Sequence, residues 1–138
     1  MKIKAHIDNS AGEHHIALTT DDNVHSILIP PKPSGFGSST NGGELLFLAL
    51  ATCYCNDIYR EAMKRNINVE RVEVEVNGDF GAAGEHAQNV TYRAQVHAKG
   101  TAEEIHALME YTDTVAEIQN TLRAGIPVKL TDIEVVNT

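Results

Sequence analysis

The feature that most constrains the fold is a long helical segment whose first half is almost wholly apolar. Residues 45–55 are apolar but for one threonine, and the segment turns polar over residues 60–65. Asn41, followed three residues later by Glu44, has the spacing of a helix-capping box, so we predict a helix over residues 41–66. A helix of about 25 residues is about 37 Å long, and one that is apolar nearly all round must be buried on most sides, by a sheet or by a second subunit.

The flanking segments alternate apolar and polar residues with the period of antiparallel strands. A loop rich in proline and glycine, residues 30–43, separates the first strands from the helix, and two capping-box signals predict short helices near the end of the chain. The order βββ-α-ββ-αα-β predicts an α+β fold in one domain, residues 1–138. The predicted strands cover residues 2–8, 15–19, 24–29, 71–77, 90–98 and 128–136, and the short helices cover 102–111 and 115–123, the second capped by Thr114.

Charge and hydropathy exclude two classes of partner. The chain has 11 Lys and Arg against 19 Asp and Glu, a net charge of −8 with no basic patch, so we expect no nucleic-acid partner. The longest apolar run, residues 45–55, falls far short of the roughly 20 residues that span a bilayer, so we expect no membrane partner. The N-terminus lacks the apolar region of a targeting signal and only two cysteines are present, so we expect a cytoplasmic protein with reduced thiols.

The two cysteines, Cys53 and Cys55, lie on the predicted helix and are separated by one residue. Residues two apart on a helix differ by about 200° of rotation, so the two thiols face nearly opposite sides and cannot form a disulfide without unwinding the turn. Cys53 shares a stripe with Leu50 and lies one turn before Asp57, whose carboxylate would raise the pKa of a nearby thiol. Cys53 is therefore either a packed small hydrophobe or a single working thiol that needs an arginine or lysine from elsewhere.

Metal and cofactor sites find little support in the sequence. The chain has no second cysteine pair and its seven histidines are scattered, so we expect no metal and no cofactor. Glu44 has two interpretations: it closes the N-terminus of the helix, or it orients a cation near a thiol almost three turns away. The cap alone explains its position.

Several segments together resemble the OsmC/Ohr family: the proline- and glycine-rich loop, ELLFLALATC at the start of the long helix, VERVEVEV in the following strand and EIQNTL in the late helix. The resemblance covers residues 25–136 and implies an intertwined homodimer in which two long helices lie in the middle, flanked by sheets. It also implies peroxide defence, because active members reduce organic hydroperoxides with a cysteine on the central helix, a second cysteine on the later helix and an Arg–Glu pair.

Position by position, the chain matches this family pattern only in part. Cys53 occupies the place of the reactive cysteine, but two glycines, residues 42–43, stand where active members have Pro-Glu, with Glu44 one position later. Ala116 occupies the place of the second cysteine, and the chain has no arginine before Arg60. Without a partner thiol, a sulfenic acid at Cys53 would need an external thiol to recycle it.

Two main hypotheses follow for function. In the first, an OsmC-like homodimer reduces organic hydroperoxides through Cys53, recycled by a small-thiol reductant, with Glu44 as polar support at the mouth of the helix. In the second, the same dimer is not an enzyme and binds a small apolar or electrophilic ligand in its interface cavity, which Cys53 only lines. A third alternative is a dimeric scaffold with no ligand. Arg60 and Arg93 are candidate cations for the thiol, and Cys55 is expected to serve packing or, from another chain, to act as a resolving thiol.

Overall fold

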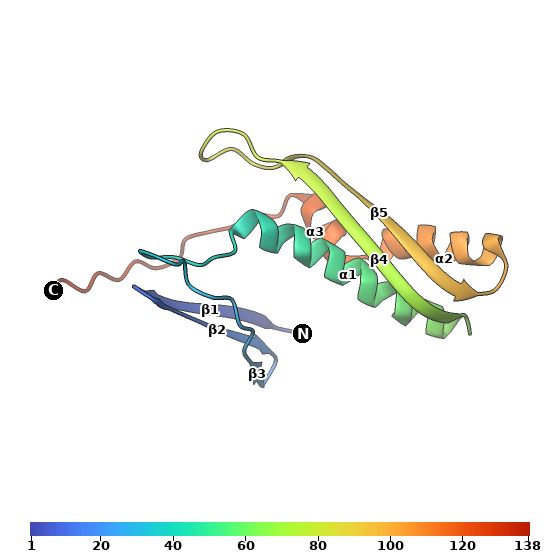
Figure 1. Ribbon diagram of the computed structural model, residues 1–138, viewed down its shortest axis with the longest axis horizontal. Helices are drawn as coiled ribbons and strands as arrows, with labels where there is room; N and C mark the ends of the chain where they lie inside the picture. The colour runs from blue at the N-terminus through green and yellow to red at the C-terminus, as the bar shows by residue number, and fades with distance from the viewer. The chain divides into compact units, whose positions relative to one another are not determined.

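The computed structural model describes all residues from Met1 to Thr138. The chain folds into two compact units, Met1–Leu46 and Phe47–Thr138, and one long helix begins in the first and continues into the second. The element order is three strands, a long helix, two strands and two helices (Figure 1). This order confirms the predicted α+β class as far as the last helix.

The first unit contains a three-stranded antiparallel meander. β1 (Ile3–Ser10) pairs along its whole length with β2 (Glu13–Thr20), and β2 pairs with β3 (Asn23–His25). Gly12 in the β1–β2 turn has a φ of 76°, which glycine adopts at no steric cost. β3 is shorter than the strand predicted over residues 24–29, because its pairing with β2 ends at His25 and residues 26–29 have no neighbouring strand to bond to.

The long helix, α1 (Gly42–Lys64), begins and ends close to where the sequence predicts. The capping box is present: the Glu44 N–H donates to Asn41 Oδ1 at 2.8 Å, and the Asn41 N–H donates to Glu44 Oε2 at 2.9 Å. Beyond Lys64, Asn66 has a φ of 55°, a left-handed conformation that asparagine tolerates and that ends helices.

The second unit is built from a long hairpin and the helices that pack against it. β4 (Asn68–Asp79) and β5 (Gln88–Lys99) pair antiparallel, and α2 (Ala102–Val115) and α3 (Glu117–Ala124) follow. Figure 1 shows the hairpin lying across α1. The core consists of Tyr54, Ile58 and Ala62 of α1 and Leu108 of α2, and the hairpin adds Val69, Val72, Val74, Tyr92, Ala94 and Val96.

The two short helices begin in different ways. Thr101 and Glu104 form the predicted capping box of α2, with the Thr101 N–H donating to Glu104 Oε2 at 2.9 Å. The predicted cap of α3 by Thr114 is wrong, because α2 continues to Val115 and keeps Thr114 helical. The Thr114 hydroxyl instead donates to the carbonyl of Tyr111 at 2.6 Å, and α3 starts without a side-chain cap.

The predicted last strand, residues 128–136, is not formed in the single chain. Gly125, with a φ of 60°, ends α3, and residues 126–138 contain neither helix nor strand. The apolar side chains of this segment are exposed to solvent, Val128 to 95%. The prediction of a strand here is wrong for the single chain, because a strand needs the edge of a neighbouring strand and this segment pairs with none in its own chain.

Few apolar side chains are fully buried in the single chain. Six apolar residues form the buried set, whereas twenty large hydrophobic side chains are exposed, among them Leu48 of α1 at 60%. The central helix therefore still presents apolar surface to solvent, although the sequence predicts burial on most of its sides. No helix in the structure has the length and apolar character needed to cross a membrane.

Candidate functional site

Four side chains from two helices meet at Cys53. Cys53, Asp57 and Arg60 are spaced four and three residues apart on α1, which places them on one face of the helix. Glu117, the first residue of α3, reaches the same face. The single proton of the Cys53 thiol has two carboxylate acceptors within reach, Asp57 Oδ2 at 3.5 Å from Sγ and Glu117 Oε2 at 3.8 Å. The site is therefore a thiol with two carboxylates and one guanidinium group beside it.

Each of the two carboxylates contacts Arg60 with one oxygen and Cys53 with the other. Asp57 Oδ1 lies 2.9 Å from Arg60 Nη1, and Glu117 Oε1 lies 3.1 Å from the same nitrogen. The other oxygen of each carboxylate is the one that contacts the thiol. Asp57 is only 5% exposed, so Arg60 is its main source of charge compensation.

A further carboxylate holds Arg60 in place. Arg60 Nε donates to Glu61 Oε1 at 2.9 Å, and Lys64 Nζ contacts the same oxygen at 2.9 Å. Hydrogen bonds from Lys64 and Arg60 lower the pKa of Glu61, so this carboxylate stays ionised at neutral pH. The guanidinium group is thus fixed beside Asp57 from two sides.

The electrostatics of the site keep Cys53 protonated. Burial raises the pKa of the Cys53 thiol; the backbone of Ile118 in the first turn of α3 opposes this, and the charges of Asp57 and Glu117 raise the pKa further. Burial also raises the pKa of Asp57, with Glu117 adding to the shift and Arg60 opposing it. Backbone hydrogen bonding at the start of α3 lowers the pKa of Glu117. At neutral pH Cys53 is therefore a thiol, and Asp57 is the adjacent group whose basicity burial increases.

A buried glutamine anchors α3 next to Cys53. Gln119 is 3% exposed, and its Nε2 donates to the carbonyl oxygen of Leu50 at 3.0 Å. Leu50 lies three residues before Cys53, so this bond joins α3 to the turn of α1 that precedes the thiol. Gln119 Oε1 is buried without a hydrogen-bond partner.

Sequence reasoning missed Glu117 and Gln119 as parts of the site. Nothing in a single sequence says which distant residue approaches a cysteine, so the sequence predicts Glu117 only as part of the helix over residues 115–123. The one sequence feature that points to these residues is the EIQ triplet at the start of the late helix, in a segment that resembles the family. There, two polar residues flank an apolar one. Ala116 just before the triplet is fully buried, at the position that the resemblance assigns to a second cysteine.

Cys55 lies on a different side of α1 from Cys53. It lines a hollow of about 280 Å³ whose wall includes Val74 of β4, whereas Cys53 contacts Glu117 of α3. Both cysteines are free. The prediction that the two thiols face apart is confirmed.

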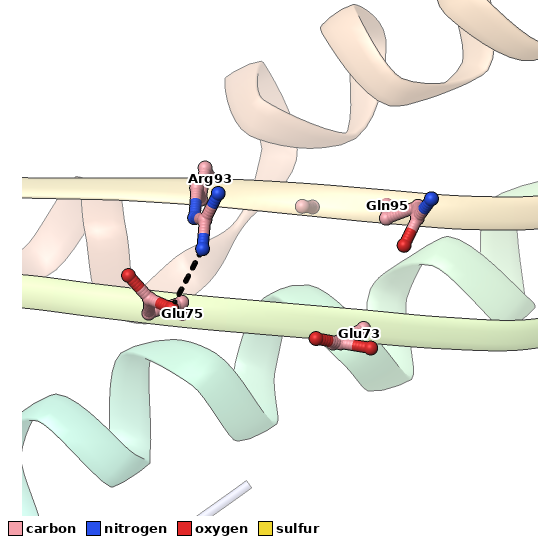
Figure 2. Close-up of a pocket in the computed structure, with 5 residues that line it drawn as sticks. Glu73, Glu75, Arg93 and Gln95 are labelled. Carbon is pink, nitrogen blue, oxygen red and sulfur yellow. Dashed lines mark hydrogen bonds and ion pairs between the residues drawn. The ribbon is translucent and has the colours of Figure 1, made fainter.

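The two candidate arginines occupy different places. Arg60 contacts both carboxylates of the thiol site. Arg93 lies on the exposed face of the hairpin, where Figure 2 shows it beside Glu75, with Arg93 Nη2 2.9 Å from Glu75 Oε2. This ion pair belongs to a hollow of about 390 Å³ that Glu73 and Gln95 also line. Within one chain, Arg60 is therefore the cation next to the thiol site, and Arg93 lies away from it.

The two other expectations for the site concern Glu44 and metal ions. The Glu44 carboxylate accepts the Asn41 N–H, as the cap interpretation requires, and a role for Glu44 in catalysis stays a prediction. Cys53, Asp57 and Glu117 each offer a ligand atom, and these atoms lie within 4.8 Å of one another. Arg60 already supplies both carboxylates with positive charge, and the absence of a metal also stays a prediction.

Comparison with known proteins identifies the class of protein that this fold and site define. A family model described as OsmC-like protein matches residues 35–131, well over half of the chain. The chain therefore belongs to the OsmC-like family. A search among curated proteins gives no significant match.

Solved structures agree with this assignment at the level of the fold. An OsmC-like protein from Mycoplasma pneumoniae superposes with a TM-score of 0.58 at 19% identity, covering 87% of each chain. An OsmC-like hydroperoxide resistance protein from Jannaschia sp. gives 0.54 at 16% identity, covering 99% of this chain and 92% of that one. An organic hydroperoxide resistance protein OsmC from Legionella pneumophila gives 0.51 at 21% identity, covering 86% and 89%.

Proposed function

We propose that this OsmC-like protein reduces organic hydroperoxides through Cys53 and is recycled by an external thiol. The observation that supports the proposal most is the group of Asp57, Arg60 and Glu117 around the one cysteine at the family's reactive position. A cysteine that serves only packing needs no such charges around its sulfur. Two of the fold relatives named above are hydroperoxide resistance proteins, which is consistent with this activity.

The proposed reaction begins with loss of the Cys53 proton. The thiolate attacks the terminal oxygen of the hydroperoxide, so that a sulfur–oxygen bond forms as the oxygen–oxygen bond breaks. The alkoxide leaves and takes up a proton to give an alcohol. Cys53 is now a sulfenic acid. One molecule of an external thiol condenses with it to a mixed disulfide and releases water, and a second molecule restores the Cys53 thiol and leaves as a disulfide.

The need for an external thiol follows from the surroundings of Cys53. Alanine stands at position 116, and Cys55 faces β4 on another side of α1. Neither can supply a resolving thiol within the same chain. A small monothiol or dithiol is therefore the proposed reductant, with Cys55 of another chain as the alternative.

We propose that the functional form is a homodimer in which residues 1–138 form one domain. The apolar surface left open on α1 and over residues 126–138 supports this proposal, since monomeric proteins rarely expose so much. An edge on a second copy would give residues 128–136 the strand partner that they lack in their own chain. Light scattering is expected to give twice the chain mass of 15.0 kDa, and a species of 15.0 kDa would rule the dimer out.

Two further points of the proposal concern the location of the protein in the cell and the role of Glu44. A cytoplasmic location is proposed because both cysteines are free and a reducing compartment would keep them so. Glu44 is proposed as polar support at the mouth of the helix, in addition to its role in the cap.

The activity is tested by following consumption of tert-butyl hydroperoxide in the presence of dithiothreitol. The wild-type protein is expected to consume the peroxide far faster than Cys53→Ser. Equal rates for the two proteins would end the enzyme hypothesis and leave the binding protein as the better description.

The rival function, a dimer that binds a small apolar or electrophilic ligand, has one observation in its favour. The pKa of Cys53 is raised, mainly by burial, so the thiol is not preformed as a nucleophile. Under this hypothesis an apolar fluorescent probe binds equally well to the wild type and to Cys53→Ser, and neither protein consumes peroxide.

A further inference from the structure

We propose that Asp57 accepts the proton of Cys53 and then returns it to the alkoxide that leaves the hydroperoxide. This inference rests on the proposed peroxidase function and deepens it, because it names the group that moves the proton and the class of peroxide that needs it. The place of Asp57 is geometric: its Oδ2 is the oxygen to which the Cys53 thiol donates at 3.5 Å.

The site provides no positive charge in direct contact with the sulfur. Arg60 Nη1 contacts Asp57 Oδ1 and Glu117 Oε1, on the oxygens turned away from the thiol contacts. The guanidinium group therefore acts on Cys53 only through the carboxylates. A thiol whose nearest charged groups are negative cannot rely on a lowered pKa for ionisation, so it needs a base within reach of its proton.

Asp57 is better suited to this task than Glu117. The Asp57 contact to sulfur is the shorter one, 3.5 Å against 3.8 Å, and Asp57 is 5% exposed whereas Glu117 is exposed. Burial raises the pKa of Asp57 while backbone hydrogen bonding at the start of α3 lowers that of Glu117. A carboxylate with a raised pKa is both the stronger base toward the thiol and, once protonated, a competent acid toward an alkoxide.

The proton that Cys53 loses is the one that the leaving oxygen gains, so the step is balanced. The Cys53 proton moves to Asp57 as the sulfur attacks, the oxygen–oxygen bond breaks, and the same proton moves from Asp57 to the departing oxygen. The products are a sulfenic acid at Cys53, an alcohol and an ionised Asp57, as at the start. Alkoxides are poor leaving groups and need this proton, whereas the carboxylate that leaves a peracid does not. Turnover of alkyl hydroperoxides is therefore expected to depend on Asp57 more than turnover of peracids does.

The test is Asp57→Asn in a Cys55→Ser background, with two readouts on the same protein. Turnover of tert-butyl hydroperoxide is expected to fall about 100-fold, the lower end of general acid–base effects. Alkylation of Cys53 by iodoacetamide at pH 8 is expected to become faster, by about threefold to tenfold, because removing a neighbouring negative charge lowers the pKa of the thiol. The two rates should move in opposite directions.

Other outcomes overturn the proposal. If both rates rise, Asp57 only suppresses the thiol; if both fall together, Asp57 only supports the structure of the site. Peracetic acid sharpens the result, since its turnover should fall less than about tenfold in the same variant. An equal loss of turnover with both peroxides would show that Asp57 does not protonate the leaving group.

Matched variants separate this inference from the function on which it rests. Asp57→Glu should recover part of the activity with tert-butyl hydroperoxide, and Asp22→Asn, an exposed aspartate on the first unit, should leave both rates unchanged. If Cys53→Ser is as active as the wild type, the proposed function fails. If Cys53→Ser is inactive but Asp57→Asn keeps full turnover, only the role of Asp57 fails. Thermal unfolding followed by circular dichroism reports whether each variant is folded.

Discussion

Cys53 and Cys55 lie two residues apart on one helix and are both half-buried and free, yet the groups around their sulfur atoms differ. Cys53 faces the start of α3, where two carboxylates and Arg60 gather around its sulfur. Cys55 faces the hairpin, in a hollow whose wall includes Val74 and which contains no charged side chain. The difference shows that the charges around a helical cysteine are set by the element that packs against its side of the helix.

The comparison is tested most strongly by replacing each cysteine in turn. Cys53→Ser is expected to lower turnover of tert-butyl hydroperoxide by at least about 1,000-fold, because it removes the proposed nucleophile. Cys55→Ser should stay within about twofold of the wild type, since its side of α1 holds none of the charged groups. A matching large loss in Cys55→Ser would show that Cys55 of another chain resolves the sulfenic acid.

A third side of α1 faces the core and should respond through stability alone. Ile58 is fully buried, and Ile58→Ala is expected to cost about 2–5 kcal/mol in the free energy of unfolding, from lost burial and the cavity left behind. Asn56 is exposed on the same helix, and Asn56→Ala should stay within about 0.5 kcal/mol of the wild type. Urea unfolding measures both values, and equal costs would contradict the assigned core.

Charge compensation at Cys53 is tested by Arg60→Gln. Without the guanidinium group, the charges of Asp57 and Glu117 act on the thiol with less compensation, so the pKa of Cys53 should rise. A rise of about one unit lowers the thiolate fraction at pH 8 about tenfold, and alkylation by iodoacetamide should slow by the same factor.

The matched control is Arg93→Gln, because Arg93 pairs with Glu75 on the exposed face of the hairpin. Both variants are made in a Cys55→Ser background, so that only one thiol is measured. Equal slowing in the two variants would show that net charge, and not the placement of Arg60, controls the thiol.

Local signals predicted most of the fold, and long-range contacts explain where prediction failed. The capping box at Asn41, the alternation in the hairpin and the opposed cysteines are properties of one segment each, and all three are confirmed. The strand over residues 128–136 fails because pairing needs an edge that the segment itself does not supply. Glu117 was missed for the same reason, since its approach to Cys53 spans 64 positions of the sequence.

The smallest expected effect tests the other carboxylate. Glu117→Gln removes one negative charge beside Cys53, and its effect on the thiol is weaker than that of Asp57 because Glu117 is exposed and solvent screens its charge. The pKa of Cys53 should fall slightly, so its thiolate fraction and its alkylation rate at pH 8 should rise, by about twofold to threefold.

Glu103→Gln, at an exposed position in the first turn of α2, removes the same charge elsewhere and should leave the rate unchanged. Slower alkylation in Glu117→Gln would contradict the prediction that the Glu117 carboxylate raises the pKa of the Cys53 thiol. It would mean that Glu117 promotes ionisation of the thiol by holding Arg60 in place, and that this placement outweighs the repulsion between the Glu117 carboxylate and the thiolate.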